Sequence, residues 1–240
     1  MTRRLAILTT FEGDMPFTAR HPDDGAKVAA GLGACRPTWQ FDTWRTSAGE
    51  WPPDVALYDG LIITGSPASV NDEAPWIAQL KQLIQERHQS KGAMLGLCFG
   101  HQAIASALGG RVARSALGLR VGKVTTQIDS PTAWMEPLRP AFTLYAAHDE
   151  QVVALPDAAT CLGGDDGCAV GAYTIGDHVL GLQYHPEFST AFMSDLLDTL
   201  APKLSAEALA LGRAQLAGTV DAPLVWGWIA RFFDQAFRRL

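Results

Sequence analysis

The sequence predicts an α/β fold, in which an open, mostly parallel twisted sheet is flanked by helices. Short apolar runs of the kind found in buried parallel strands occur at residues 5–10, 61–64 and 94–97. Between the second and third runs, apolar residues recur at helical spacing up to about residue 89. A chain of 240 residues is long enough for one sizeable domain and short for two.

The other elements are expected in chain order as follows. A loop rich in Asp, Pro and Gly occupies residues 11–24. Further strands are expected at residues 39–44, 121–128 and 142–146, with a hairpin-like pair at 169–175 and 179–183. Helices are expected after Pro75, at 99–108, from about 190, and in the segment that carries Trp226, Trp228, Ile229, Phe232, Phe233 and Phe237. We place a main domain at residues 1–195 and a helical C-terminal extension, packed on it, at 196–240.

A strand, a helix and a second strand at this spacing predict a right-handed crossover between parallel neighbours. The carboxyl ends of the two strands then meet at one edge of the sheet. Gly65 follows the first strand and Cys98 follows the second, so both are expected at that edge. Open α/β sheets bind their ligands there.

Cys98 lies in the sequence Gly96-Leu97-Cys98-Phe99-Gly100, between a buried strand and a helix. Glycines two residues before and after it leave room for a sharp turn that projects the cysteine side chain. The helix N-terminus favours the thiolate, which is the nucleophilic form of the side chain. A buried core cysteine is the alternative, and the flanking glycines favour a nucleophile.

His185 and Glu187 come at a strand end in Tyr184-His185-Pro186-Glu187-Phe188. Residues two apart in extended chain project to the same side, so Glu187 is expected to accept from one ring nitrogen of His185 while the other faces Cys98. The sequence thus predicts a Cys-His-Glu triad. Two alternatives are a solvated histidine in a surface loop and a metal site of His148, His185 and Glu187, for which Cys98 is an odd fourth ligand. We expect no metal and no cofactor.

Acyl transfer also needs N–H donors where the oxyanion forms. The candidates are the backbone N–H of Phe99 and a backbone N–H of the Gly65-Ser66 turn, since Pro67 has none. Taken alone, Gly65-Ser66-Pro67 predicts only a turn.

Composition limits the location and the partners. The net charge of -6 and the lack of a clustered Lys/Arg run argue against nucleic acid or an anionic membrane as a partner. No signal peptide or membrane span is recognisable, and the spacing of the 4 cysteines favours reduced thiols in a cytoplasmic protein. The aromatic residues of the last helix predict packing on the domain itself, with a homodimer or acceptor-subunit interface as the alternative.

These motifs together resemble the class I (triad) glutamine amidotransferases, in particular the glutaminase domain of GMP synthetase and its stand-alone relatives. The resemblance rests on Tyr58 to Pro67, Leu95 to Gln102 and Gln183 to Phe188. It implies a flavodoxin-like fold and a γ-glutamyl thioester on Cys98 that releases ammonia. It also implies His185 as acid and base, Glu187 as its orienter, and L-glutamine held by Gln102 and the His148-Asp149 turn.

The chain departs from that family at two places. Glu150 stands where the family has an Asp, and Gly118-Leu119-Arg120 replaces a Gly-Trp/Phe-Glu segment. This Gly-Leu-Arg segment, together with Gly65-Ser66-Pro67 and the Trp-bearing last helix, resembles the plant-type γ-glutamyl peptidases. That resemblance implies glutathione-like or other γ-glutamyl compounds as alternative substrates. No ATP-binding signature is present, so a synthetase partner would be a separate protein. A non-catalytic, redox-sensing relative is a further alternative, which the His185-Glu187 pair disfavours.

Overall fold

The computed structural model describes residues 2–11, 15 and 17–238, and its centre is a 9-stranded sheet in the order β2-β1-β3-β4-β11-β10-β9-β6-β7. From β2 to β11 neighbouring strands run parallel, and from β11 to β7 they run antiparallel. The strands are β1 Arg4–Thr9, β2 Gln40–Arg45, β3 Gly60–Ile63, β4 Ala93–Leu97, β6 Arg120–Ile128, β7 Ala141–His148, β9 Ala159–Asp165, β10 Cys168–Ile175 and β11 Val179–Leu182. A small sheet pairs β5 (Arg111–Arg114) with β8 (Glu150–Ala154).

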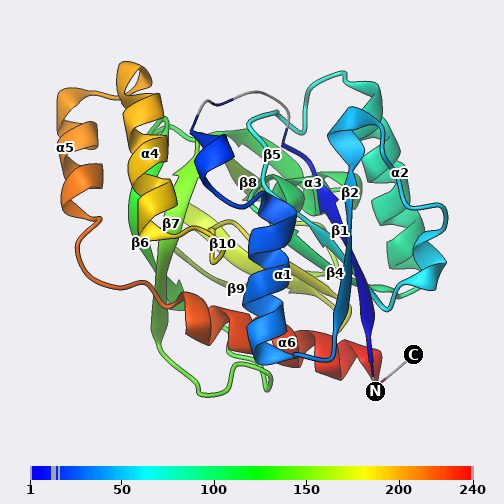
Figure 1. Cartoon of the computed structure of the whole chain (residues 1–240). Coiled ribbons are helices and arrows are strands. Elements are labelled where there is room, and N and C mark those ends of the chain that lie inside the picture. Colours follow the sequence, from blue (N-terminus) through cyan, green and yellow to red (C-terminus); the bar gives the residue numbers. More distant parts are fainter. Residues whose placement is uncertain (1, 12–14, 16, 239–240) are drawn as a thin grey trace.

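Helices cover both faces of the large sheet (Figure 1). On one face lie α1 and α6, and on the other lie α2 and α3, while α4 and α5 stand beside β6 and β7. The helices are α1 Asp24–Cys35, α2 Pro75–Gln89, α3 Phe99–Ala107, α4 Thr190–Leu200, α5 Ala206–Ala214 and α6 Ala222–Phe237. This arrangement confirms the predicted α/β class with a mostly parallel sheet.

Strand β1 illustrates how the sequence builds the two layers. Leu5 and Ile7 pack with α1 and α6, whereas Ala6 and Leu8 pack with α2 and α3. All of these side chains are fully buried. A continuous apolar run is required here because alternate side chains enter different cores.

Helix α6 packs its aromatic side chains into the domain. Trp226, Trp228, Phe232, Phe233 and Phe237 are all buried within the core that contains β1, β4 and β7. In this structure the aromatic face of α6 is therefore part of the core beneath the sheet. The proposed division at residue 195 falls within α4 and stays a prediction.

Several elements had no clear signal in the sequence. These are the helices α1 and α5 and the strands β5, β8 and β9. Helix α1 begins after Asp23, whose carboxylate accepts the N–H of Ala26 at 2.7 Å. Its sequence contains three glycines, which are poor helix formers, so tertiary packing contributes much of its stability.

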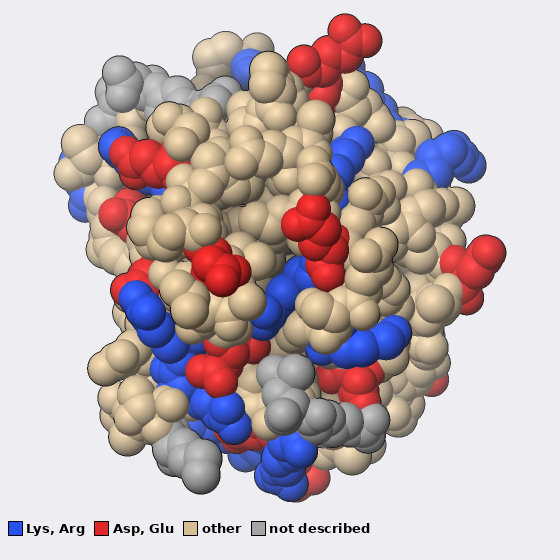
Figure 2. Space-filling model, turned by 90° about the vertical axis from the view of Figure 1, so that its right-hand side faces the viewer, with Lys and Arg blue, Asp and Glu red and all other residues tan. Residues whose placement is uncertain are grey.

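Acidic and basic side chains are interspersed over the face shown in Figure 2. Such a surface provides no extended area of one sign for a polyanion or polycation on this side. Among the described residues, no helix combines the length and the apolar character that crossing a membrane requires.

Candidate active site

Cys98 forms the sharp turn that joins β4 to α3. Its backbone has φ 49° and ψ -103°, which is a strained conformation for a residue with a Cβ. A Cβ on Gly96 would stand 2.4 Å from the backbone of Gly100, and one on Gly100 would stand 2.3 Å from the carbonyl oxygen of Ile63. Both glycines are thus required by close backbone approach, as the motif predicted.

His185 and Glu187 meet just beyond the end of β11. The Nδ1 atom of His185 lies 2.7 Å from Oε1 of Glu187, and both side chains are buried. Burial alone lowers the pKa of His185, but the charges of Glu187 and of the Cys98 sulfur outweigh it and raise that pKa to about 10. The imidazole is therefore a cation at neutral pH.

Gly65 brings the two ends of the predicted triad to one point. A Cβ at this position would stand 3.0 Å from Cε1 of His185 and 3.6 Å from the Cβ of Cys98. Within the described part of the chain, Nε2 of His185 has no hydrogen-bond partner. Phe188 stacks on the imidazole with centroids 3.9 Å apart and an angle of 8°, which holds the plane of the ring.

The candidate oxyanion donors lie at the same sheet edge. Gly65 and Ser66 line the pocket beside Cys98, and Phe99 is the first residue of α3. Among the described residues, none accepts a hydrogen bond from the backbone N–H of Ser66 or Phe99. Two free donors next to the sulfur are the arrangement that an oxyanion needs.

A chain of amides reaches the sulfur from the floor of the pocket. Nε2 of Gln183 lies 3.6 Å from Sγ of Cys98, and Oε1 of Gln183 accepts from Nε2 of Gln102 at 3.2 Å. Gln102 also donates to the carbonyl of Glu150 at 2.8 Å. Gln102, for which the family resemblance implies substrate binding, lines the pocket, and its amide nitrogen is already engaged by protein atoms. The sequence indicated Gln183 only as part of a motif, and its contact with sulfur was not foreseen.

His148 and Asp149 also line the pocket, at the bend between β7 and β8. Nδ1 of His148 lies 2.9 Å from the carbonyl oxygen of Glu150, and burial lowers the pKa of His148 to about 4. His148 is therefore neutral, unlike His185. The carboxylate of Glu150 accepts from the hydroxyl of Ser69 at 2.8 Å, so the residue that departs from the family pattern orders a neighbouring loop.

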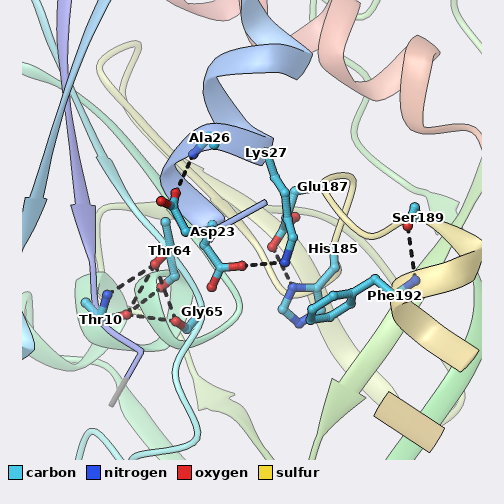
Figure 3. A network of polar contacts seen from close by, with 11 residues as sticks. Thr10, Asp23, Ala26, Lys27, Thr64, Gly65, His185, Glu187, Ser189 and Phe192 are labelled. Carbon is cyan, nitrogen blue, oxygen red and sulfur yellow. Dashed lines mark hydrogen bonds and ion pairs between the residues drawn. The ribbon is translucent and has the colours of Figure 1, made fainter. Parts of the chain in front are cut away.

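Helix α1 adds two residues that the sequence did not indicate. Lys27 pairs with Asp24 at 2.9 Å, and its Nζ lies 3.5 Å from the centre of the Phe192 ring. Figure 3 shows Lys27 beside His185 and Glu187. Burial raises the pKa of Asp24, which Lys27 opposes. The sequence did not indicate either residue, because α1 has no strong amphipathic pattern that would predict a helix here.

The pocket at this edge has a volume of about 250 Å³ and two kinds of wall. The polar floor holds Cys98, Gln102, His148 and His185. Lys203 also lines the pocket, and the apolar part of the wall consists of Phe11, Met15, Phe17, Phe192, Leu196 and Leu200. Within the described residues, no three His, Cys, Asp or Glu side chains gather as metal ligands would.

Comparisons with known proteins bear on the family and the fold of the chain. Residues 29–197 match the sequence profile of a family described as glutamine amidotransferase class-I. Gamma-glutamyl peptidase 3 of Arabidopsis thaliana is 32% identical over 170 residues, which are 66% of this chain and 67% of that protein. A glutamine-hydrolyzing GMP synthase component of Halobacterium salinarum is 31% identical over 137 residues, 57% of this chain and 70% of that protein. A crystal structure of a glutamine amido transferase from Methylobacillus flagellatus has the same fold, with a TM-score of 0.78, 21% identity, and coverage of 100% and 96% of the two chains.

Proposed function

The chain belongs to the class-I glutamine amidotransferase family, and we propose that Cys98, His185 and Glu187 form the catalytic triad of a γ-glutamyl amide hydrolase. The family comprises hydrolases and amidotransferases that use cysteine catalysis. The observation that carries the proposal is the buried His185-Glu187 pair beside the strained turn at Cys98. An imidazolium in this position favours the thiolate form of the cysteine.

In the acylation step, Sγ of Cys98 attacks the γ-carbonyl carbon of the substrate and a tetrahedral oxyanion forms. The backbone N–H groups of Ser66 and Phe99 donate to that oxyanion. The free Nε2 of His185 gives its proton to the departing nitrogen, the C–N bond breaks, and a γ-glutamyl thioester remains on Cys98.

In the deacylation step, a water molecule attacks the thioester carbonyl and gives a proton to Nε2 of His185. Collapse of the second tetrahedral intermediate breaks the C–S bond, which releases glutamate and restores the thiolate. Glu187 holds the imidazole in one orientation and stabilises its positive charge in both steps. Gln183 donates to the sulfur and stabilises the thiolate as nucleophile and as leaving group.

Two leaving groups follow from this chemistry. With L-glutamine the product is ammonia, and its acceptor would be a separate synthetase protein. The apolar wall of the pocket supports a second candidate, since ammonia would leave this wall without a contact. A γ-glutamyl peptide or a similar compound would place its amine portion there, with Lys203 near any carboxylate that it carries. We propose a small-molecule substrate in either case and a cytoplasmic location. We propose neither nucleic acid nor a membrane as a partner, and a homodimer is the alternative to a monomer.

The test is glutamate release by the purified protein from L-glutamine and, in parallel, from glutathione. Cys98→Ala serves as the control variant for background activity. Release from glutamine that is lost in the variant supports an amidotransferase, and release from glutathione supports a γ-glutamyl peptidase. If neither substrate is cleaved, covalent labelling of Cys98 by a γ-glutamyl chloroketone tests the site itself. Failure of both hydrolysis and labelling would contradict the proposed function.

A further inference from the structure

We infer that Thr10 is a positioning residue, which orients the Gly65-Ser66 peptide so that its N–H faces Cys98. The inference rests on the proposed γ-glutamyl chemistry, because it assigns that N–H to the oxyanion. Thr10 follows β1 and is fully buried. It lies outside the motifs that predicted the site.

The hydroxyl of Thr10 lies where it can donate to two carbonyl oxygens of the turn. Its Oγ1 atom is 2.9 Å from the oxygen of Gly65 and 3.1 Å from the oxygen of Thr64. The backbone N–H of Thr10 donates in turn to Oγ1 of Thr64 at 3.2 Å. Two buried threonines, one after β1 and one after β3, therefore clasp the start of the turn, as Figure 3 shows.

Because the peptide between Gly65 and Ser66 is trans, the hydrogen bonds to the Gly65 carbonyl also fix the direction of the Ser66 N–H. The carbonyl and the N–H of a trans peptide point in opposite directions. Thr10 binds the Gly65 carbonyl on one side, and His185 lies on the other side of Gly65 (Figure 3). A Cβ on Gly65 would also stand 3.6 Å from the Cβ of Cys98. The N–H of Ser66 consequently points away from Thr10 and toward the reacting sulfur.

Thr64 also connects Thr10 to Phe99, the second proposed oxyanion donor. The carbonyl of Thr64 accepts the backbone N–H of Gly100 at 3.1 Å, in the first turn of α3. Phe99 is the residue before Gly100, so the two proposed donors are joined through Thr64. Thr10, which binds the carbonyls on both sides of Gly65, sets the spacing between them.

Loss of the Thr10 hydroxyl would leave the Gly65 carbonyl with a weaker partner. The remaining hydroxyl, Oγ1 of Thr64, is 3.4 Å away. A buried carbonyl that loses its donor gains free energy by turning toward another partner or toward water. Such a rotation would carry the N–H of Ser66 out of the oxyanion position.

Thr10→Val removes the hydroxyl at nearly constant volume, and Thr10→Ser keeps it. Thr9→Val is the matched control, because Thr9 is the preceding residue, is also buried, and donates to the carbonyl of Trp44 at 3.3 Å instead. We expect Thr10→Val to lower kcat by about 10- to 100-fold with less than about a threefold change in KM. Thr10→Ser restores kcat to within about threefold of wild type, and Thr9→Val changes it by less than about twofold.

A readout that does not need turnover separates this inference from the proposed function. Protein labelled with ¹⁵N-serine reports the amide of Ser66 by NMR, through its chemical shift and its hydrogen-exchange rate. We expect the Ser66 signal to move in Thr10→Val and to stay in Thr9→Val. Alkylation of Cys98 by iodoacetamide, which forms no oxyanion, should change by less than about twofold in either variant.

Two results would overturn the positioning role of Thr10. An unmoved Ser66 signal in Thr10→Val, or a kcat equal to wild type, would overturn the positioning role. If Thr10→Val does not fold, Thr64→Val is measured in the same way, because it removes the other hydroxyl of the clasp. If the wild type cleaves neither L-glutamine nor glutathione and the γ-glutamyl chloroketone does not label Cys98, the proposed function is contradicted. The Ser66 signal alone then decides whether Thr10 orients the peptide.

Discussion

Strand β11 carries a histidine at each end, and the two ends behave in opposite ways. His178 precedes the strand at the amino edge of the sheet, and His185 lies beyond its carboxyl edge. Both side chains are buried, with 5% and 4% of their surface exposed. Burial, the nearby His88 and the charge of Lys91 lower the pKa of His178 to about 4, whereas the pKa of His185 is raised to about 10.

The difference lies in the partner that each imidazole meets. Nε2 of His178 lies 3.0 Å from Nδ1 of His88, whose ring is stacked 5.0 Å away, and Nδ1 of His178 lies 3.8 Å from the carboxylate of Asp177, beyond normal hydrogen-bond distance. Nδ1 of His185 lies 2.7 Å from the carboxylate of Glu187. Burial makes any charge costly, so a buried imidazole becomes a cation only where a carboxylate lies within hydrogen-bond distance, as Glu187 does for His185 and Asp177 does not for His178. Burial therefore does not by itself decide whether a histidine is charged.

Glu187→Gln should abolish the difference in charge between His185 and His178. It should also lower kcat more than Gln183→Met or Phe188→Leu. The amide fits the same space but removes the charge that holds the His185 cation, so we expect kcat to fall by about 10³- to 10⁴-fold. The pKa of His185 should fall as well, and the alkaline limb of the rate profile should move to lower pH. Steady-state kinetics from pH 6 to pH 10 would measure both. An unchanged rate with an unchanged profile would contradict the triad.

Titration of His178 should make the protein less stable in acid. Its pKa is depressed in the folded protein relative to 6.5, so the unfolded chain binds more protons as the pH falls from 6.5 toward 4. From pH 7 to pH 5 this residue should cost roughly 2 kcal/mol of unfolding free energy. Urea unfolding of wild type and His178→Gln at both pH values measures it, since the variant should lose less stability.

His185, at the other end of β11, provides the control variant for that experiment. The pKa of His185 is raised, so its contribution to stability is fully present below pH 6.5 and is lost as the pH rises toward 10. His185→Gln should therefore flatten the alkaline side of the stability curve and leave the acid side steep. Parallel curves for wild type and both variants would show that partner chemistry does not distinguish the two ends.

Gln183→Met tests the contribution of the Cys98 sulfur and its hydrogen-bond donor to the difference between the two ends of β11. The variant keeps the volume of a fully buried side chain but removes the amide donor to Sγ of Cys98. A hydrogen bond to a charged group contributes about 1.5–3 kcal/mol, so the rate of Cys98 alkylation by iodoacetamide at pH 7 should fall and kcat should fall by about 10- to 100-fold. A kcat equal to wild type would remove Gln183 from the site.

Phe188→Leu should have the smallest effect. It removes the ring stacked on His185 but leaves the hydrogen bond to Glu187. Aromatic stacking contributes about 0.5–1.5 kcal/mol, so we expect kcat to fall by about 2- to 10-fold. The pH profile should keep its position, because the charges that set the pKa of His185 remain. A large shift of that profile would mean that Phe188 controls the charge and not only the orientation of the imidazole.

The parts of the site that the sequence predicted share a local cause. The turn at Cys98 follows from glycines two residues away on either side, and the contact between His185 and Glu187 follows from a spacing of two in extended chain. The parallel pairing of β3 with β4 brings their carboxyl ends together and so places Gly65 next to Cys98. The sequence did not predict helix α1, because this helix is stabilised by packing against β1 and α6.

The sequence by itself determined the α/β class, the strands that end at the site, and the residue types that could perform acyl transfer. These depend on periodicity, glycine placement and spacing, which are properties of a few consecutive residues. Only the tertiary structure decided which carbonyl Thr10 holds, which sulfur Gln183 meets, and which histidine carries a charge. Those outcomes depend on burial and on charges from segments far apart in the chain, and no local pattern records them.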